Sequence, residues 1–289
     1  MALTLEPALL AALSRLKLVT RRRADGVPAG NRIGRRRGHS LDFADHRAYA
    51  DGDDLRFLDW QVLARHDQTF IRRYHEEQAL PVRLLIDTSA SMAQGGKFDM
   101  ARRLAAGLAF VALAGGAVLS IHPVAARPRP PLGPLRGRAR LRAVLDYLGE
   151  LATSGVAALD PVARAVTVPG RAGLSVILSD FLYADGCERA LAQLDHARHA
   201  LFLVRVVARE EEEPEEGGDL SLVDAETGEV LGLTLTRSVL ATYRGALAAH
   251  VAGLEDAARK RSAGLASVRA DRPLAEILLK DLTAKGLLA

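Results

Sequence analysis

The sequence predicts an α/β protein whose mostly parallel sheet carries helices on both faces, preceded by an N-terminal extension. After Pro81, short apolar runs alternate with longer segments in which apolar residues recur every three or four positions. This alternation is typical of a parallel sheet with crossover helices. The apolar runs are nearly uninterrupted, as in strands buried on both faces, and 289 residues with 49% hydrophobic content can bury a substantial core. We therefore expect two parts, an extension at 1–80 and the α/β domain at 81–289.

Each predicted element has a local reason. Strands are expected at the short apolar runs 82–86, 118–122, 174–178 and 201–207. Helices are expected where apolar residues fall on one stripe, at 5–18, 98–113, 141–151, 188–199, 239–260 and 273–287. The segment from Leu220 to Leu235 is expected to form a hairpin that turns at Glu226-Thr227-Gly228. The Pro-rich stretch 126–134 is expected to be a loop.

One uncharged stretch, from Leu104 to Ile121, is long enough to raise the question of a membrane span. It is mostly Ala and Gly, and Gly115-Gly116 divide it into a helix and a following strand, so we expect no membrane span. The N-terminal sequence lacks a signal-peptide pattern, and Cys187 is the only cysteine, so no internal disulfide can form. We therefore expect a cytoplasmic protein.

Charge is distributed unevenly along the chain. The net charge is +4, but a basic arm precedes a slightly acidic body. The basic residues of this arm are Lys17, Arg21, Arg22, Arg23, Arg32, Arg35, Arg36 and Arg37. Such an arm could bind nucleic acid through its phosphates, but it lacks interleaved aromatic residues and any DNA-reading motif. A solvated arm, or a contact with an acidic partner surface, is therefore favoured, and the acidic run Glu210–Glu213 is interpreted as a solvated loop.

Two of the predicted strands end in acidic residues. One runs into Asp87-Thr88-Ser89-Ala90-Ser91 and the other into Ser179-Asp180, and ligands of such sheets bind at the carboxyl ends of the strands. In an extended loop Asp87, Ser89 and Ser91 alternate, so three oxygens can point the same way. Carboxylate and hydroxyl oxygens prefer Mg²⁺, Mn²⁺ or Ca²⁺ over zinc. We expect Asp87, Ser89, Ser91 and Asp180 to form a divalent-cation site. The structural alternative is an Asx or Ser/Thr turn that only shapes the loop.

Asp-x-Ser-x-Ser after a buried strand, followed by an Asp at the end of a later strand, resembles the metal-ion-dependent adhesion site of von Willebrand A domains. The resemblance implies that Asp87, Ser89 and Ser91 form the first loop, that Asp180 is the later aspartate, and that an acidic residue of a partner fills the open metal position. That family also uses a threonine from a middle loop. The best local match places Ala157 at that position, and Thr153 or Ser154 could substitute only with a shifted loop.

A longer resemblance precedes this motif. Its segments are Arg37-Gly38, Asp42-Phe43, Arg47-Ala48-Tyr49, Gly52-Asp53-Asp54-Leu55-Arg56, Asp59-Trp60, Ala64-Arg65 and Phe70-Ile71-Arg72. They look like the signature of the bacterial family named domain of unknown function 58. The resemblance implies a von Willebrand A-type protein that works beside a MoxR-type AAA+ ATPase, as an adaptor in remodelling or assembling a client protein.

Other residues that could carry chemistry have simpler interpretations. Asp53, Asp54 and Asp59 are expected to pair with local arginines, while Trp60 anchors its segment to a core. His196 and His199 are expected at the surface, because no further ligand lies at a matching spacing. Cys187 has no catalytic partner set.

The sequence thus favours a non-enzymatic interaction module in which a divalent cation accepts a carboxylate from a partner protein. The first alternative is a magnesium-dependent hydrolase or phosphoryl-transfer enzyme that uses the same oxygens, although no general base can be named beside them. The second is nucleic-acid binding through Arg21–Arg37.

Overall fold

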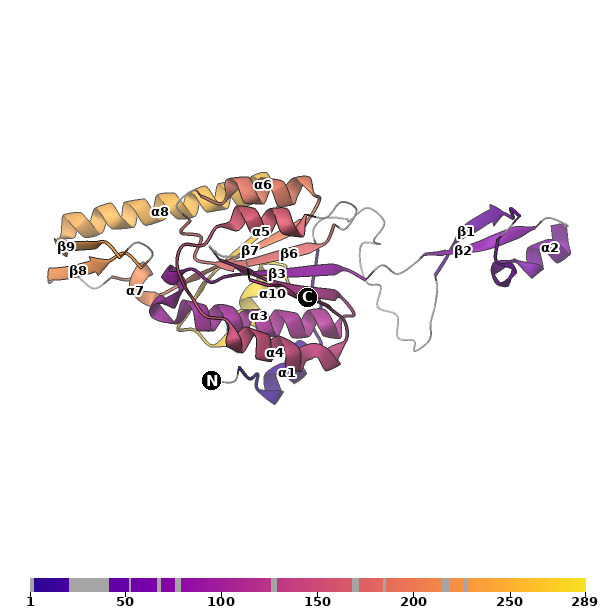
Figure 1. Cartoon of the computed structure of the whole chain (residues 1–289), viewed down its shortest axis with the longest axis horizontal. Helices are drawn as coiled ribbons and strands as arrows, with labels where there is room; N and C mark the ends of the chain where they lie inside the picture. The colour runs from indigo at the N-terminus through magenta and orange to yellow at the C-terminus, as the bar shows by residue number, and fades with distance from the viewer. Residues whose placement is uncertain are drawn as a thin grey trace. The chain divides into compact units, whose positions relative to one another are not determined.

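Figure 1 shows a computed structural model of the chain, which describes residues 3–20, 42–51, 53–66, 69–75, 79–125, 129–167, 172–183, 186–214, 219–225 and 228–289. The chain divides into two compact units. One comprises Gly26–Ala79, and the other comprises Met1–Asp25 together with Leu80–Ala289. The arginines of the basic arm from Arg21 to Arg37 lie outside the described residues.

The larger unit is built on a six-stranded sheet in the order β10-β7-β6-β3-β4-β5. The strands are β3 (Pro81–Asp87), β4 (Val118–Val124), β5 (Leu132–Leu135), β6 (Leu174–Ser179), β7 (Ala200–Val207) and β10 (Gly264–Arg269). The strand pairs are parallel except for β4 with β5, which is antiparallel at one edge. The prediction of a mixed α/β fold with a mostly parallel central sheet is confirmed.

Helices cover both faces of this sheet (Figure 1). They are α1 (Pro7–Leu13), α3 (Lys97–Ala114), α4 (Leu141–Glu150), α5 (Leu159–Val166), α6 (Glu188–His196), α7 (Arg209–Glu212), α8 (Arg237–Lys260), α9 (Leu274–Glu276), a π-helical turn (Ile277–Asp281) and α10 (Leu282–Ala284). Because side chains alternate across a strand, Leu84 and Ile86 pack into the core that contains α3, whereas Leu85 packs into the core of α5 and α6. This alternation explains why β3 is apolar throughout.

The first helix belongs to the larger unit. Leu9 and Leu13 of α1 are buried in the core beneath the sheet, and Leu18 forms a β-bridge with Leu288. Residues 3–20 therefore fold with the α/β unit, which differs from the expected division that places all of 1–80 in a separate extension.

The smaller unit has its own local structure. Strand β1 (Asp42–Ala48) pairs antiparallel with β2 (Phe70–His75), and a short helical turn (Leu55–Phe57) and α2 (Trp60–His66) lie between them. Arg47 pairs with Asp53 and Arg56 pairs with Asp54, as expected. Asp59 contacts His46 and caps α2 by accepting hydrogen bonds from the backbone N–H groups of its first turn. Trp60 is 62% exposed, so the prediction that it anchors the segment to a core is wrong.

Several elements differ from those expected. The Pro-rich stretch contains the short strand β5, and β10 follows the long helix α8. The predicted hairpin is present as β8 (Asp219–Val223) and β9 (Val230–Thr234), and its turn residues Glu226 and Thr227 lie outside the described residues. The acidic run expected as a loop contains α7.

The uncharged stretch is divided as expected, since α3 ends at Ala114 and β4 begins at Val118. Among the described residues, no helix combines the length and apolar character that crossing a bilayer requires.

Candidate functional site

The candidate site lies at the carboxyl ends of two neighbouring parallel strands. β3 and β6 pair directly, with Ile86 opposite Leu178 in the register, so the residues that follow them emerge at the same edge of the sheet. Asp87 and Asp180 are 1% and 3% exposed, respectively. Topology alone therefore brings together two acidic segments that are more than ninety residues apart along the chain, as the strand-end prediction requires.

The Asp87 carboxylate is held by hydrogen bonds on both oxygens. Its Oδ1 accepts from the backbone N–H of Ser89 at 2.9 Å, and its Oδ2 accepts from Ser179 Oγ at 2.5 Å. The first bond is the Asx-type turn that the sequence offers as the structural alternative. The hydroxyls of Ser89 and Ser91 lie 2.9 Å apart, so these side chains point toward each other beside Asp87.

Burial dominates the electrostatics of Asp87. Removal from water raises the pKa of its carboxyl; the hydrogen bonds from Ser179 and Ser89 act in the opposite direction, and the charge of Asp180 adds to the increase. Burial, followed by the charge of Asp87, also raises the pKa of the nearby Tyr183 hydroxyl well above its ordinary value. The site thus concentrates negative charge that a cation would stabilise.

Asp180 is engaged by a side chain that sequence reasoning missed. Its Oδ2 accepts from Lys97 Nζ at 2.8 Å, and its Oδ1 accepts from the backbone N–H of Leu182 at 3.1 Å. Lys97, the first residue of α3, is only 1% exposed. Burial alone would lower the pKa of Lys97, but the charges of Asp180 and Glu211 and the hydrogen bonds to them outweigh burial and raise it. The Lys97 side chain therefore stays protonated and provides a positive charge within the site.

Glu211 is the second residue that sequence reasoning missed. Its Oε1 lies 2.5 Å from Lys97 Nζ, although its segment was interpreted as a solvated loop. A signal for Lys97 was present in the sequence. A lysine at the first position of a helix is repelled by the positive end of the helix dipole, so a carboxylate is expected to lie near it.

The backbone next to Asp180 is held in an uncommon conformation. Phe181 has a φ of 61°, in the left-handed region that a bulky residue rarely adopts. Its N–H donates to Ser179 Oγ at 2.8 Å, and its ring is buried against that of Tyr183. Such conformations persist where the surroundings enforce them and are concentrated at functional sites, which supports this sheet edge as the candidate site.

The middle loop expected to complete the site does contact the first loop. Ser154 N–H donates to the Thr88 carbonyl at 2.8 Å, and Ala90 N–H donates to the Gly155 carbonyl at 2.9 Å. Ala157 is buried in the core of α5 and α6, whereas Thr153 is half-buried beside Ser154. The structure brings this loop to the site, with an alanine at the matched threonine position.

The donor set can be tested against Mg²⁺. Neighbouring ligands of an octahedral Mg²⁺, each about 2.1 Å from the ion, lie about 3 Å apart, and the Ser89–Ser91 hydroxyl separation of 2.9 Å matches that spacing. Asp87 is an anionic oxygen ligand beside them, so these three residues fit the ion. Asp180 differs from Asp87 in that it pairs with the buried Lys97 ammonium, whose positive charge opposes a second cation at the same carboxylate, so Asp180 fits a supporting position better than a direct one. No cluster of three His, Cys, Asp or Glu side chains suited to a metal occurs in the described part of the chain.

The remaining candidates are structural. His196 is exposed as expected, but the prediction that His199 is a surface residue is wrong: it is 1% exposed, and its Nδ1 lies 2.7 Å from Ser175 Oγ. Burial, followed by the charge of Arg83, lowers the pKa of His199 to about 4. Burial, followed by the charge of Glu188, raises the pKa of the Cys187 thiol to about 11. A buried thiol that stays protonated is not a nucleophile.

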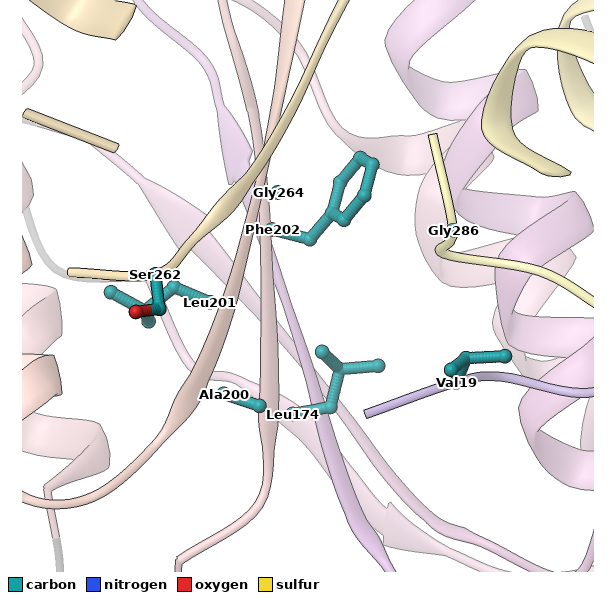
Figure 2. Close-up of a pocket in the computed structure, with 8 residues that line it drawn as sticks. All are labelled: Val19, Leu174, Ala200, Leu201, Phe202, Ser262, Gly264 and Gly286. Carbon is teal, nitrogen blue, oxygen red and sulfur yellow. The ribbon is translucent and has the colours of Figure 1, made fainter. Parts of the chain in front are cut away.

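A pocket occurs at the opposite end of the sheet (Figure 2). Its lining includes Leu174, Ala200 and Gly264, which begin β6, β7 and β10, together with Val19 and Phe202. Among the described residues that line it, Ser262 alone has a polar side chain and none is charged. The lining of this pocket is mostly apolar, whereas the carboxyl end of the sheet carries Asp87, Asp180 and Lys97, so the two places differ in chemical character.

Proteins similar to this chain occur in mycobacteria and among solved structures. Uncharacterized proteins of Mycobacterium bovis and Mycobacterium tuberculosis are each 32% identical over 287 residues, which cover 94% of this chain and 89% of the relative. Among solved structures, BatB from Bacteroides thetaiotaomicron matches 72% of this chain and 98% of its own at 11% identity, with a TM-score of 0.42. An aerotolerance-related membrane protein from Bacteroides fragilis matches with a TM-score of 0.38 and 13% identity. TM-scores of this size do not establish a shared fold.

The family match covers both units of the chain. A family model described as "Protein of unknown function DUF58" matches residues 45–253, which include part of β1, all of β2, both strand-terminal aspartates, Lys97 and Glu211. Since this match spans more than half of the chain, and the mycobacterial relatives align over nearly all of it, the protein belongs to the DUF58 family.

Proposed function

We propose that this protein is a non-enzymatic interaction module that docks an acidic side chain of a partner protein at the carboxyl edge of its parallel sheet. The observation that carries this proposal is the convergence of Asp87, Ser89 and Ser91 with the end of β6 at one buried edge. The resemblance to the domain of unknown function 58 family suggests a MoxR-type AAA+ ATPase and its client as the partners to test.

A divalent cation is the proposed bridge between the two proteins. Asp87, Ser89 and Ser91 would hold Mg²⁺, or Mn²⁺ or Ca²⁺, and the ion would supply an open coordination position for an incoming carboxylate. Asp180 would support these ligands without contacting the ion itself, and Lys97 would fix the orientation of the Asp180 carboxylate through the 2.8 Å hydrogen bond. Ser179 would orient Asp87 through its hydroxyl.

The docking role is favoured over a hydrolase because of the side chains around Asp87. The carboxylates that could act as a general base there already accept hydrogen bonds, Asp87 from Ser179 and Ser89 and Asp180 from Lys97 and Leu182. A hydrolase needs a general base within hydrogen-bond reach of the attacking water. The nucleic-acid alternative rests on the basic arm from Arg21 to Arg37, which lies outside the described residues.

Magnesium binding to the full-length chain tests the proposal first. Asp87→Asn keeps the size of the side chain and removes its charge, and Asp146→Asn is the matched control because Asp146 is an exposed acid on α4. We expect Mg²⁺ to raise the unfolding temperature of the wild type and of the control but not that of Asp87→Asn. At a Mg²⁺ concentration 100 times the Kd, the stabilisation is about 2.7 kcal/mol.

Partner binding tests the second half of the proposal. We expect Asp87→Asn and added chelator each to abolish binding to the MoxR-type ATPase of the same organism, measured by surface plasmon resonance. Binding that survives both the substitution and the chelator would exclude a metal-mediated contact.

A further inference from the structure

The three charged groups beside β6 are not equally fixed. Lys97 and Asp180 are buried, at 1% and 3% exposure, whereas the Glu211 side chain is 27% exposed. Asp180 follows directly from β6 and is also anchored through the N–H of Leu182. Glu211 belongs to the four-residue helix α7. Glu211 is therefore the member that can leave while the buried lysine keeps a partner.

The charges of the three groups also distinguish Glu211 from Asp180. Lys97 and Asp180 together form a neutral pair, so Glu211 brings a second carboxylate to a cation that already has one. Release of Glu211 leaves the buried ion pair complete, whereas loss of Asp180 would leave a buried lysine with only a surface carboxylate. The Glu211 position can thus exchange one carboxylate for another without exposing an unpaired buried charge.

Helix α7 is held in place by a few identifiable contacts. The second oxygen of Glu211, Oε2, accepts from the N–H of Ala208 at 2.8 Å, and Tyr243 of α8 donates to the Glu211 carbonyl at 2.7 Å. Gly95, in the loop after Ser91, approaches so closely that a Cβ there would lie 2.2 Å from the Cβ of Ala208. A helix of one turn is not stable by itself, so α7 stays docked through these contacts and the Lys97 bond.

From this arrangement we infer that α7 is an internal latch and that the Glu211 carboxylate occupies the place at Lys97 that an acidic side chain of a partner takes on docking. The inference rests on the proposed docking function and adds a second, lysine-based recognition position to it. The ligand it defines is a carboxylate that can accept from Lys97 Nζ with one oxygen and from a backbone N–H with the other. Docking then requires α7 to release Glu211.

Chemical rescue tests the carboxylate position without any partner. Glu211→Ala removes the part of the side chain that acetate replaces, and acetamide is the uncharged probe of the same shape. The readout is the NMR amide signal of Ala208 in the full-length chain, followed during titration with acetate, acetamide or chloride at equal ionic strength. We expect saturable acetate binding to Glu211→Ala at a concentration at least about tenfold below that needed by the wild type, because the wild-type position is mostly occupied. Acetamide should produce no such response.

Two further variants provide a control and a second test. Glu210→Ala changes an exposed acid on the same helix and should behave like the wild type. Glu211→Gln keeps the side-chain volume and should bind the ATPase partner several-fold more tightly than the wild type. Equal responses to acetate and acetamide, or equal acetate responses of Glu211→Ala and the wild type, would overturn the latch.

The failures of the two proposals differ. If Asp87→Asn loses the partner and Glu211→Gln binds no more tightly than the wild type, the latch is wrong and the docking function stands. If Asp87→Asn binds the partner as the wild type does, the docking function is wrong, whatever the acetate titration shows.

Discussion

The two ends of the central sheet bury polar groups in opposite ways. At the carboxyl end, Asp180 and Lys97 are buried as charged groups because they pair with each other. At the amino end, His199 precedes β7 and is equally buried, but its lowered pKa keeps the imidazole neutral near pH 7. The residues that the structure describes around the nearby pocket are uncharged (Figure 2).

The difference shows where this fold tolerates unneutralised charge. Burial of an ion without a partner costs several kcal/mol, so an isolated group gives up its charge instead. At the carboxyl end Asp180 and Glu211 contact Lys97, while the buried Asp87 carboxyl nearby is held by Ser179 and Ser89. Carboxyl groups gathered in this way, with the pKa of Asp87 raised by burial, are typical of a site that binds a cation or a partner.

The largest effect is expected from removing the lysine at the carboxyl end. Lys97→Met should destabilise the protein by about 3–5 kcal/mol, because it leaves the buried Asp180 without a counter-charge. Lys260→Met is the control: Lys260 is 70% exposed in its pair with Asp256, so its removal should cost less than about 1 kcal/mol. Urea denaturation measures the free energy of unfolding of both variants, and equal losses would show that the buried pair contributes no more to stability than the exposed one.

Acid should destabilise the protein through two histidines, because burial lowers the pKa of both His122 and His199 to about 4, and His199 is the one at the amino end. The unfolded imidazole of His199 takes up a proton near pH 6.5, whereas the folded one, whose pKa is lowered to about 4, does not. The unfolded state thus binds more protons between pH 6.5 and 4, and stability is lost as the pH falls through this window, by up to about 3 kcal/mol from this residue.

The measurement for His199 is the free energy of unfolding at pH 7 and at pH 4.5. His199→Asn should show a smaller loss between the two pH values than the wild type. His196→Asn, at an exposed position on α6, should retain the full loss. An unchanged pH dependence in His199→Asn would assign the acid sensitivity to other groups.

Packing at the amino end can be tested at Gly264. A Cβ there would lie 2.3 Å from the ring of Phe202, so Gly264→Ala should cost about 1–3 kcal/mol through forced repacking. Gly232→Ala in β9 is the control, because a Cβ there meets nothing within 4 Å. Thermal unfolding distinguishes them, and equal midpoints would show that the amino end adapts without strain.

The smallest effect is expected at the rim of the carboxyl end. Glu212 is 33% exposed and lies 3.6 Å from the buried Arg205, so Glu212→Gln should cost about 1 kcal/mol or less. Glu210→Gln on the same helix should cost nothing measurable, since Glu210 is exposed. A loss from Glu212→Gln as large as that from Lys97→Met would show that charge is equally essential at the rim.

Much of the fold was predictable because its signals are local. The continuous apolar runs of β3, β6 and β7 predict buried strands whatever surrounds them. β5 was missed because its sequence, Leu132-Gly133-Pro134-Leu135, contains two residues that disfavour strands. β10 was missed because only alternate residues of this edge strand are buried, which leaves a weak apolar signal.

The candidate site was predictable only in part. Asp87 and Asp180 stand out because each ends an apolar run. Their serine partners and the buried state of His199 depend on which strands are neighbours, which no local pattern encodes.

The sequence by itself determined the buried strands β3, β4, β6 and β7, the long helices α3 and α8 and the acidic residues at two strand ends, because hydrophobic periodicity is a property of a few consecutive residues. Only the tertiary structure decided that Asp180 is paired with Lys97 and that Glu211 shares that lysine. These contacts join residues 83 and 114 positions apart. Their distances are set by how α3 and α7 dock at the end of the sheet, so the charge state of the site is a property of the packing.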